Sequence, residues 1–335
     1  MKSSTTPYSI LELATVNVGS GPAQSFKDTV NLAQQAEILG YHRFWLAEHH
    51  NMVSIASSAT AVLIGHVAGA TERIRVGSGG IMLPNHSPLI VAEQFGTLGS
   101  IYPNRIDLGL GRAPGTDQVT AHAIRSDRMQ AVYQFPEEIV KIQEYFSVDN
   151  KNAKVRATVA EGVKVPLYVL GSSTDSAHVA AAKGLPYAFA SHFAPAQLFD
   201  ALAIYYNEFK PSDQLSEPYT MACINVIAAE TDAEAEKLAT SLIRMMLGVM
   251  TGNLDYMQPP EEPTDEMRSL MSNPAFERML KYAFIGSKTT VANQTMKFLA
   301  DSGVNELMVV SHIFDHSARV NSYKLFAEIM EEIES

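Results

Sequence analysis

The sequence predicts an α/β fold, a closed (β/α)8 or TIM barrel in which eight parallel strands alternate with helices. The first observation is a set of short, nearly continuous apolar runs, which are typical of strands buried on both faces of a parallel sheet. The second is that amphipathic helical patterns separate these runs. An open doubly wound sheet is the alternative, and eight such units in a row favour the closed barrel. The predicted strands are Tyr8–Val16, His42–Ala47, Ile74–Gly79, Arg105–Leu110, Val165–Leu170, Tyr187–Ala190, Tyr219–Ala228 and Glu306–Val310.

The ends of the predicted helices carry residues that suit helix termini. Glycine follows a helical run and precedes a strand at three places, where it fits a left-handed cap: Gly40, Gly184 and Gly303. A hydroxyl residue stands at four expected helix starts: Ser25, Ser87, Thr231 and Ser287. These boundaries support the alternation of strand and helix.

The length of 335 residues suits a single barrel domain with insertions, covering residues 1–335. Two stretches exceed the minimal repeat, Ala113–Ala160 after the fourth strand and Val249–Lys281 after the seventh. The second stretch contains Pro259-Pro260-Glu261-Glu262-Pro263 and several methionines, which predicts a mobile loop beside a helix. Long loops in compact domains commonly act as lids or binding loops. A solvated insertion in front of a methionine-filled helix is the other interpretation.

Composition restricts the classes of function. Apolar residues make up 46% of the chain and charged residues 18%, which is a globular composition. The net charge of −11 repels phosphate backbones, so we expect no nucleic-acid partner. The single cysteine, Cys223, excludes a disulfide framework or a cysteine-based zinc site within the chain. Neither a secretory signal in Met1–Ser9 nor a transmembrane run is present, so we expect a cytoplasmic enzyme with no membrane partner.

Distinctive residues follow the predicted strands, and in a barrel these positions converge on one face. Glu48-His49-His50 comes after the second strand. Neighbouring side chains of an extended chain point in opposite directions, so one histidine faces the mouth while the other packs or hydrogen-bonds. We predict that His49 is a general base or a flavin contact. A buried, hydrogen-bonded histidine pair is the alternative.

Glycine-rich turns follow the third, fourth and fifth strands. Gly79-Gly80 would let a flat ligand lie against the backbone, although a simple tight turn uses the same residues. Arg112 stands at the tip of a small-residue turn and suits bidentate phosphate recognition. Gly171-Ser172-Ser173-Thr174-Asp175-Ser176 opens a helix whose free N–H groups and hydroxyls form an anion site. A surface arginine and an ordinary N-cap are the separate alternatives, but together the two features predict a phosphate site.

Histidines also follow the sixth and eighth strands, at His192 and in the segment Ser311-His312-Ile313-Phe314-Asp315-His316. With Glu48-His49-His50 they form a conceivable set of metal ligands. Metal-dependent barrels commonly show His-x-His early in the chain and an aspartate late, and no predicted strand here ends in His-x-His. We therefore predict no metal site.

These segments together resemble the bacterial luciferase-like flavin monooxygenase family, and the similarity extends from Ser9 to about Met330. It is closer to the uncharacterised or FMN-type branch than to the light-emitting subunits. The similarity is densest in five stretches: Trp45–Asn51, Val76–Pro88, Glu93–Leu98, Arg105–Gly115 and Asp315–Arg319.

The resemblance implies a barrel that holds reduced flavin mononucleotide (FMN) and reacts it with O₂. By similarity, His49 acts in general acid–base chemistry, and Gly79-Gly80 matches a non-prolyl cis peptide beneath the flavin ring. Arg112 matches an arginine that contacts the phosphate. Three serines match the phosphate loop, two through backbone N–H groups and the last through its side chain: Ser172, Ser173 and Ser176.

One departure from the family pattern narrows the expected activity. Light-emitting members carry a reactive cysteine after the fourth strand, where this sequence has Gly111, and Cys223 lies in another strand. This argues against aldehyde-dependent light emission and leaves monooxygenation open.

The sequence has no Gly-x-Gly-x-x-Gly fingerprint for a nicotinamide cofactor, so we expect a separate reductase to supply reduced flavin. O₂ would add to this flavin to give a peroxide that oxidises a small organic substrate. A deazaflavin (F420) enzyme of hydride transfer and a flavin-binding protein without turnover are the alternatives, and His49 favours an enzyme. The small-residue segment Ser58–Ala70 and the resemblance predict a homodimer through this region, with packing inside one chain as the alternative.

Overall fold

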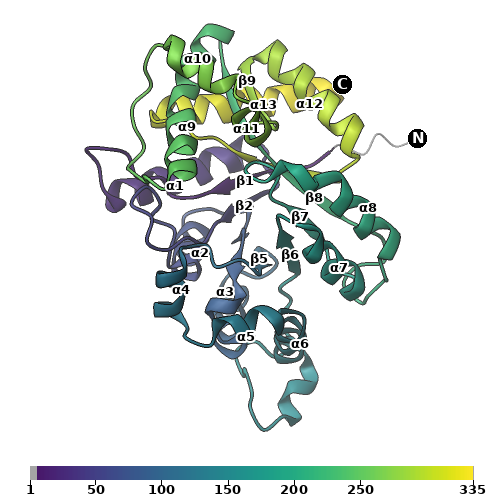
Figure 1. Cartoon of the computed structure of the whole chain (residues 1–335). Coiled ribbons are helices and arrows are strands. Elements are labelled where there is room, and N and C mark those ends of the chain that lie inside the picture. Colours follow the sequence, from purple (N-terminus) through teal and green to yellow (C-terminus); the bar gives the residue numbers. More distant parts are fainter. Residues whose placement is uncertain (1–5, 335) are drawn as a thin grey trace.

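The computed structural model describes residues 6–334 and confirms the closed barrel, so the first five residues of the N-terminal segment considered above lie outside it. The barrel strands pair in parallel in the order β10-β1-β2-β3-β5-β6-β7-β8, and β8 pairs with β10 to close the ring (Figure 1). They are β1 (Tyr8–Glu12), β2 (Arg43–Leu46), β3 (Arg75–Ser78), β5 (Ile106–Gly111), β6 (Leu167–Gly171), β7 (Tyr187–Phe189), β8 (Thr220–Ala229) and β10 (Glu306–Val310).

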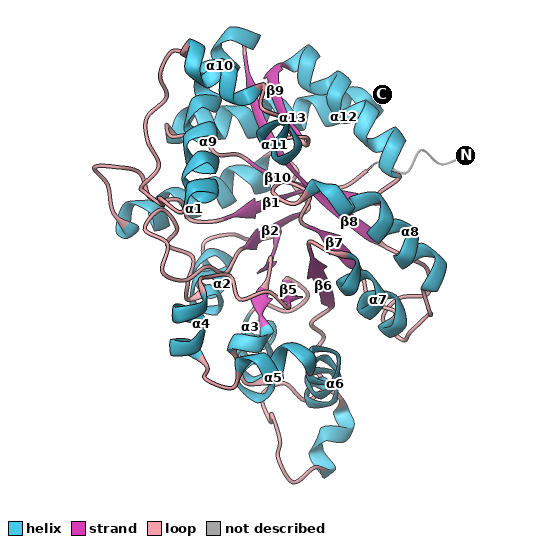
Figure 2. Cartoon of the chain, viewed as in Figure 1, coloured by secondary structure: helices cyan, strands magenta, loops and turns pink. Residues whose placement is uncertain are grey.

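Helices surround the strands, as Figure 2 shows with the strands in magenta at the centre. This arrangement buries both faces of the sheet, which explains the continuous apolar runs in the sequence. None of the helices described between residues 6 and 334 is long and apolar enough to cross a membrane. The principal outer helices are α1 (Pro22–Ile38), α2 (Thr60–Gly69), α3 (Pro88–Ile101), α6 (Phe135–Phe146), α7 (Thr174–Lys183), α8 (Leu198–Glu208), α9 (Asp232–Thr251), α12 (Lys288–Ser302) and α13 (His316–Glu334).

Most predicted helix boundaries agree with the structure. Gly184 and Gly303 are left-handed caps, and Gly40 also has a positive φ. Thr231 is the N-cap of α9 and its hydroxyl accepts a backbone N–H at 3.2 Å. The prediction for Ser25 is wrong, because α1 already begins at Pro22. Proline has a fixed φ that suits the first helical position, so Ser25 is buried inside the helix.

The sequence does not predict two of the strands, β4 (Ile81–Met82) and β9 (Ala283–Ser287). The first half of β8 pairs with β10, whereas its second half continues beyond the ring and pairs with β9. Side chains of β9 alternate between buried and partly buried, so this strand lacks a continuous apolar run. The first predicted strand, Tyr8–Val16, is also too long, since β1 ends at Glu12.

Both predicted insertions contain helices. Residues 113–160 include α4 (Gln118–Ile124), α5 (Arg128–Tyr133) and the outer helix α6, followed by a 3-10 turn at Val148–Asn152; residues 249–281 include α10 (Asp265–Met271) and α11 (Pro274–Met279). Between α9 and α10 the chain has no helix, and Met257 forms backbone hydrogen bonds with Val16 (3.0 Å) and Val18 (2.9 Å). The loop after α9 is therefore anchored to the segment that follows β1.

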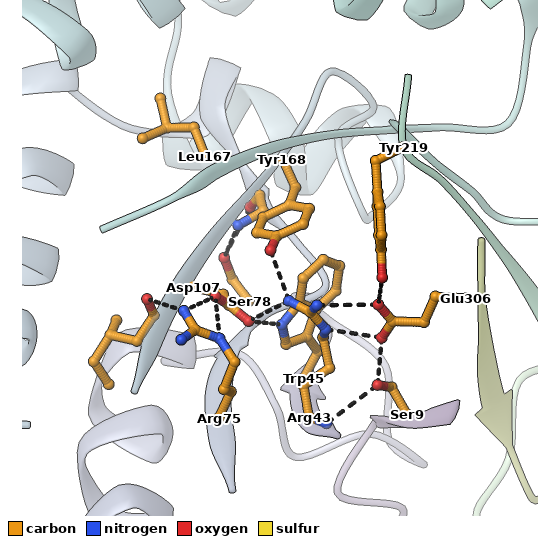
Figure 3. Close-up of polar contacts among 12 residues, drawn as sticks. Ser9, Arg43, Trp45, Arg75, Ser78, Asp107, Leu167, Tyr168, Tyr219 and Glu306 are labelled. Carbon is orange, nitrogen blue, oxygen red and sulfur yellow. Dashed lines mark hydrogen bonds and ion pairs between the residues drawn. The ribbon is translucent and has the colours of Figure 1, made fainter. Parts of the chain in front are cut away.

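The amino-terminal end of the barrel is filled by a buried ionic network, which we call the barrel floor and define as Arg43, Arg75, Asp107 and Glu306 (Figure 3). Arg43 lies 2.8 Å from Asp107 and 2.8 Å from Glu306, and Arg75 is paired with Asp107. Neither carboxylate is exposed to solvent. Additional hydrogen bonds to the network come from Ser9, Trp45, Tyr168 and Tyr219.

Candidate active site

A cavity of about 1110 Å³ opens at the carboxyl ends of the strands. Residues that follow β2, β3, β5, β6, β7 and β10 line it, together with part of α9 and the loop after it. Sites of this size that are lined mainly by apolar side chains are typical for cofactors and small substrates. Methionine, a flexible and polarisable side chain, contributes eight of the lining residues: Met52, Met82, Met221, Met245, Met246, Met257, Met279 and Met308.

Arg112 and the serine turn meet at one end of the cavity. Arg112 directly follows β5, and its guanidinium lies 2.7 Å from the Asp175 carboxylate in the first turn of α7. Ser173 is the N-cap of α7, and its side chain forms no capping hydrogen bond. The first N–H groups of α7 therefore have no side-chain cap, and the helix dipole adds partial positive charge at this point. The Arg112 guanidinium and the helix terminus lie together at one corner of the cavity, which we call the positive corner. The Asp175 carboxylate balances part of this charge and does not line the cavity.

Gly171 and Ser176 determine the shape of this turn. The Ser176 hydroxyl donates to the Ser173 carbonyl at 2.8 Å and lies 3.0 Å from the Tyr187 hydroxyl. A Cβ added at Gly171 would lie 1.7 Å from the Ser176 Oγ, so only glycine lets this side chain lie against the strand end. Ser172, Ser173 and Ser176 all line the cavity. To donate to an anion, the Ser176 hydroxyl would have to give up its hydrogen bond to the Ser173 carbonyl.

The peptide bond between Gly79 and Gly80 is cis, as the resemblance implies. Gly79 lines the cavity, whereas Gly80 does not and is buried behind it. A Cβ at Gly79 would lie 2.7 Å from the Leu11 Cδ1, and one at Gly80 would lie 2.9 Å from the Gly109 carbonyl oxygen. A side chain at either glycine would force neighbouring atoms to move, so bare backbone forms this part of the wall.

The two adjacent histidines after β2 have different partners. His49 lines the cavity, and its Nδ1 lies 3.2 Å from the Gly115 carbonyl oxygen. Burial lowers the pKa of His49, although that hydrogen bond and the Glu48 charge raise it. Since a carbonyl only accepts, Nδ1 carries the proton of the neutral ring and Nε2 is left unprotonated. His49 can therefore accept a proton at Nε2.

The Glu48 carboxylate pairs with the second histidine of the two, His50, and also with His86. This buried carboxylate lies 2.9 Å from the Nε2 of His50 and 2.9 Å from the Nε2 of His86, and it accepts the Met82 N–H at 3.0 Å. These hydrogen bonds outweigh the effect of burial and lower the pKa of Glu48 to about 2. The sequence does not reveal this cluster, because His86 is brought in from a different βα unit.

His192 and His312 are the functional candidates that the sequence leaves without a role. His192 follows β7 and His312 follows β10, and both line the cavity. Both are buried, with exposed fractions of 8% and 4%. Their position after predicted strands was the available signal, but only the structure shows them on the same wall.

The histidines considered as metal ligands divide between separate places. Those that line the cavity are His49, His50, His192 and His312. Glu48 binds His50 and His86, while His316 lies 2.8 Å from Asn31. Within the described part of the chain, no group of three or more His, Cys, Asp or Glu residues is arranged to hold a metal ion. Cys223 lines the cavity from β8, and burial raises the pKa of its thiol well above the ordinary value.

Comparison with known proteins agrees with this geometry. A family model described as luciferase-like monooxygenase matches residues 6–324. A luciferase-like monooxygenase of Escherichia coli (strain K12) is 44% identical over 333 residues, which cover 99% of each chain. The N-acetyl-S-alkylcysteine monooxygenase of Bacillus subtilis (strain 168) is 32% identical over 327 residues, 96% of this chain and 97% of that protein.

A solved structure, that of apo-MsnO8, superposes with a TM-score of 0.89 at 34% identity and covers 97% of this chain and 98% of the other. The resemblance inferred from the sequence is thus confirmed over nearly the whole chain, as is the assignment as an enzyme. With its closed barrel and its cavity at the carboxyl ends of the strands, the chain belongs to the luciferase-like monooxygenase family.

Proposed function

We propose that this enzyme uses reduced FMN and O₂ to oxidise a small organic substrate inside the cavity. The observation that carries the proposal is the positive corner, where Arg112 lies beside the uncapped N-terminus of α7. A helix N-terminus with an adjacent arginine is a site for a phosphate group. This site opens directly into the apolar cavity, where a flavin ring could lie.

The residues present fit FMN in charge and in shape. Arg112 and the backbone N–H groups of Ser172 and Ser173 would hold the phosphate, and the bare backbone at Gly79 would leave room for a flat ring. The cavity of about 1110 Å³ is at the upper end of ordinary ligand sites, so it has space for a substrate beside the cofactor.

Bound reduced FMN would supply the electrons that activate O₂, so that one oxygen atom enters the substrate and the other leaves as water. A separate reductase would deliver the reduced cofactor. The chain itself would orient the reactants and keep water out, since most of the cavity wall is apolar. His49 would take or return a proton at Nε2, which is unprotonated because Nδ1 is held by Gly115.

One relative indicates a class of substrate. Its name states that it acts on N-acetyl-S-alkylcysteine, a compound with an alkyl thioether. The methionine-rich wall of this cavity is apolar and adaptable, which suits such an alkyl or thioether chain.

Exposed apolar side chains support the proposed homodimer. Val62 of α2 is 72% exposed, and Ile101 of the adjacent α3 is 59% exposed. Each of these helices thus leaves a large apolar side chain open to contact with a second copy of the chain. Light scattering should give the mass of two chains, and the mass of one chain would contradict the dimer.

The proposed reaction can be tested by rapid mixing of the protein with photoreduced FMN and O₂. We expect the protein to bind the cofactor and to slow its reoxidation. His49→Ala should lower turnover about 10²- to 10⁴-fold without changing FMN affinity, because a general acid–base group contributes about that factor. His122→Ala, on the exposed face of α4, is the matched control. Reoxidation at the rate of free FMN, or turnover with reduced F420 and no consumption of O₂, would contradict the proposal.

A further inference from the structure

Buried polar atoms without a hydrogen-bond partner concentrate on one wall of the barrel mouth. Twelve such side-chain atoms occur among the described residues. Four of them belong to the adjoining strands β7, β8 and β10 or to the residues just after these strands: His192 Nδ1, Asn225 Oδ1, Ser311 Oγ and His312 Nδ1. Because buried polar groups in folded proteins nearly always have partners, this cluster indicates a missing ligand.

The strands themselves bring the four residues together. Asn225 of β8 is in register with Val310, the residue before Ser311. The Asn225 side chain also donates a hydrogen bond of 2.6 Å to the His192 carbonyl oxygen. Both imidazoles line the cavity, and neither forms a hydrogen bond or ion pair with any described residue. The polar wall is thus fixed by backbone pairing, while its two imidazoles remain available.

The wall carries no charge when the cavity is empty. Burial, together with the neighbouring imidazoles of His312 and His49, lowers the pKa of His192 to about 3, and burial lowers the pKa of His312 to about 4. Cys223, which also faces this region, remains a protonated thiol because burial raises its pKa. No acidic side chain contributes to the pKa shift of either imidazole. An anion would meet no repulsion here.

We propose that His192 and His312, with Asn225 and Ser311 behind them, recognise a carboxylate carried by an otherwise apolar substrate. This inference rests on the proposed monooxygenase function and names the substrate class. A neutral imidazole offers one N–H donor and one acceptor nitrogen, so the two imidazoles that line the cavity can each donate one hydrogen bond to a ligand. A carboxylate is a pure acceptor with two oxygens, and an imidazole can gain a proton to match its charge. An ammonium group would find only the acceptor nitrogens of imidazoles that stay neutral, because histidine cannot become an anion here. Met221 and Met308 beside the wall suit the apolar part.

Binding of such an anion should also take up a proton. An opposite charge stabilises the protonated form of histidine, and a lone carboxylate in an apolar cavity is strongly disfavoured. One of the two imidazoles should therefore become protonated as the carboxylate enters. This coupling would not occur with a neutral ligand of the same length.

The test compares octanoate with 1-octanol by titration calorimetry on the protein loaded with oxidised FMN and on the protein without it. We expect octanoate to bind at least about tenfold more tightly at pH 7, the factor that a charge-assisted hydrogen bond provides. Its binding enthalpy should change between buffers of different ionisation enthalpy, which reports proton uptake. His192→Phe and His312→Phe should each remove about this tenfold preference and leave octanol affinity unchanged.

Two further variants separate recognition from folding. His122→Phe, outside the cavity lining, should behave as the unaltered protein. His192→Gln keeps a donor and should retain part of the preference, even if His192→Phe fails to fold. Three results would overturn the inference: equal affinities for octanoate and octanol, no saturable octanoate binding, or the full preference for octanoate in both Phe variants. The last of these would mean that bound water alone satisfies the unpartnered atoms. FMN fluorescence on the same samples tests the proposed function separately.

Discussion

The two ends of the barrel use buried polar groups in opposite ways. At the barrel floor, both arginines and both carboxylates are paired with one another, and the surrounding hydroxyl and indole groups complete their hydrogen bonds. At the mouth, the imidazoles of His192 and His312 are also buried, but neither has a hydrogen-bond partner among the described residues. Buried polar groups therefore stabilise the fold at the amino-terminal end of the barrel. At the carboxyl-terminal end they remain available to a ligand, as expected for this architecture.

The largest expected loss of unfolding free energy comes from disrupting the barrel floor. Asp107→Ala leaves Arg43 and Arg75 without a shared carboxylate in a buried position, and removal of one partner of a buried ion pair costs about 3–5 kcal/mol. Urea denaturation should show this loss of unfolding free energy. Asp301→Ala, which removes the exposed pair with Lys297, should cost less than about 1 kcal/mol. Similar losses in the two variants would contradict the distinction between the floor and the surface.

Glu48 sharpens the comparison, because it lies at the mouth and yet is fully bonded. Its pKa falls to about 2 from an ordinary value of 4.5, so its stabilising contribution is present above about pH 4.5 and is lost as the pH falls toward 2. The native protein should lose up to about 3 kcal/mol through this group over that interval, and Glu48→Gln should not. Denaturation at pH 5, 4 and 3 measures the difference, and parallel curves would refute this assignment.

A substitution at Gly171 tests whether the shape of the positive corner matters as much as its charge. Gly171→Ala places a Cβ within 1.7 Å of the Ser176 Oγ, so the turn must move. Such overpacking costs about 1–3 kcal/mol, and it should weaken FMN binding more than riboflavin binding. Gly21→Ala, where a Cβ meets nothing within 4 Å, is the control. Equal weakening of FMN and riboflavin binding would place the effect outside the positive corner.

Local patterns allow much of this molecule to be predicted from the sequence. Apolar runs give the barrel strands, and strand order in a barrel brings Arg112 to the turn that contains Asp175. The strand β9 escapes prediction because its side chains alternate between buried and partly buried, so it has no continuous apolar run. The unpartnered state of His192 and His312 escapes it as well, since it depends on how three distant strands meet around the cavity.

The proposed phosphate site is tested most directly by a fluorescence titration of the protein with FMN and with riboflavin, which lacks the phosphate. The native protein should bind FMN at least about tenfold more tightly, because a charge-assisted hydrogen bond supplies that factor. Arg112→Ala should remove most of the difference, whereas Arg156→Ala, which breaks the exposed pair with Glu161, should keep it. Equal affinity of the native protein for both ligands, or equal weakening of both in Arg112→Ala, would contradict the phosphate site.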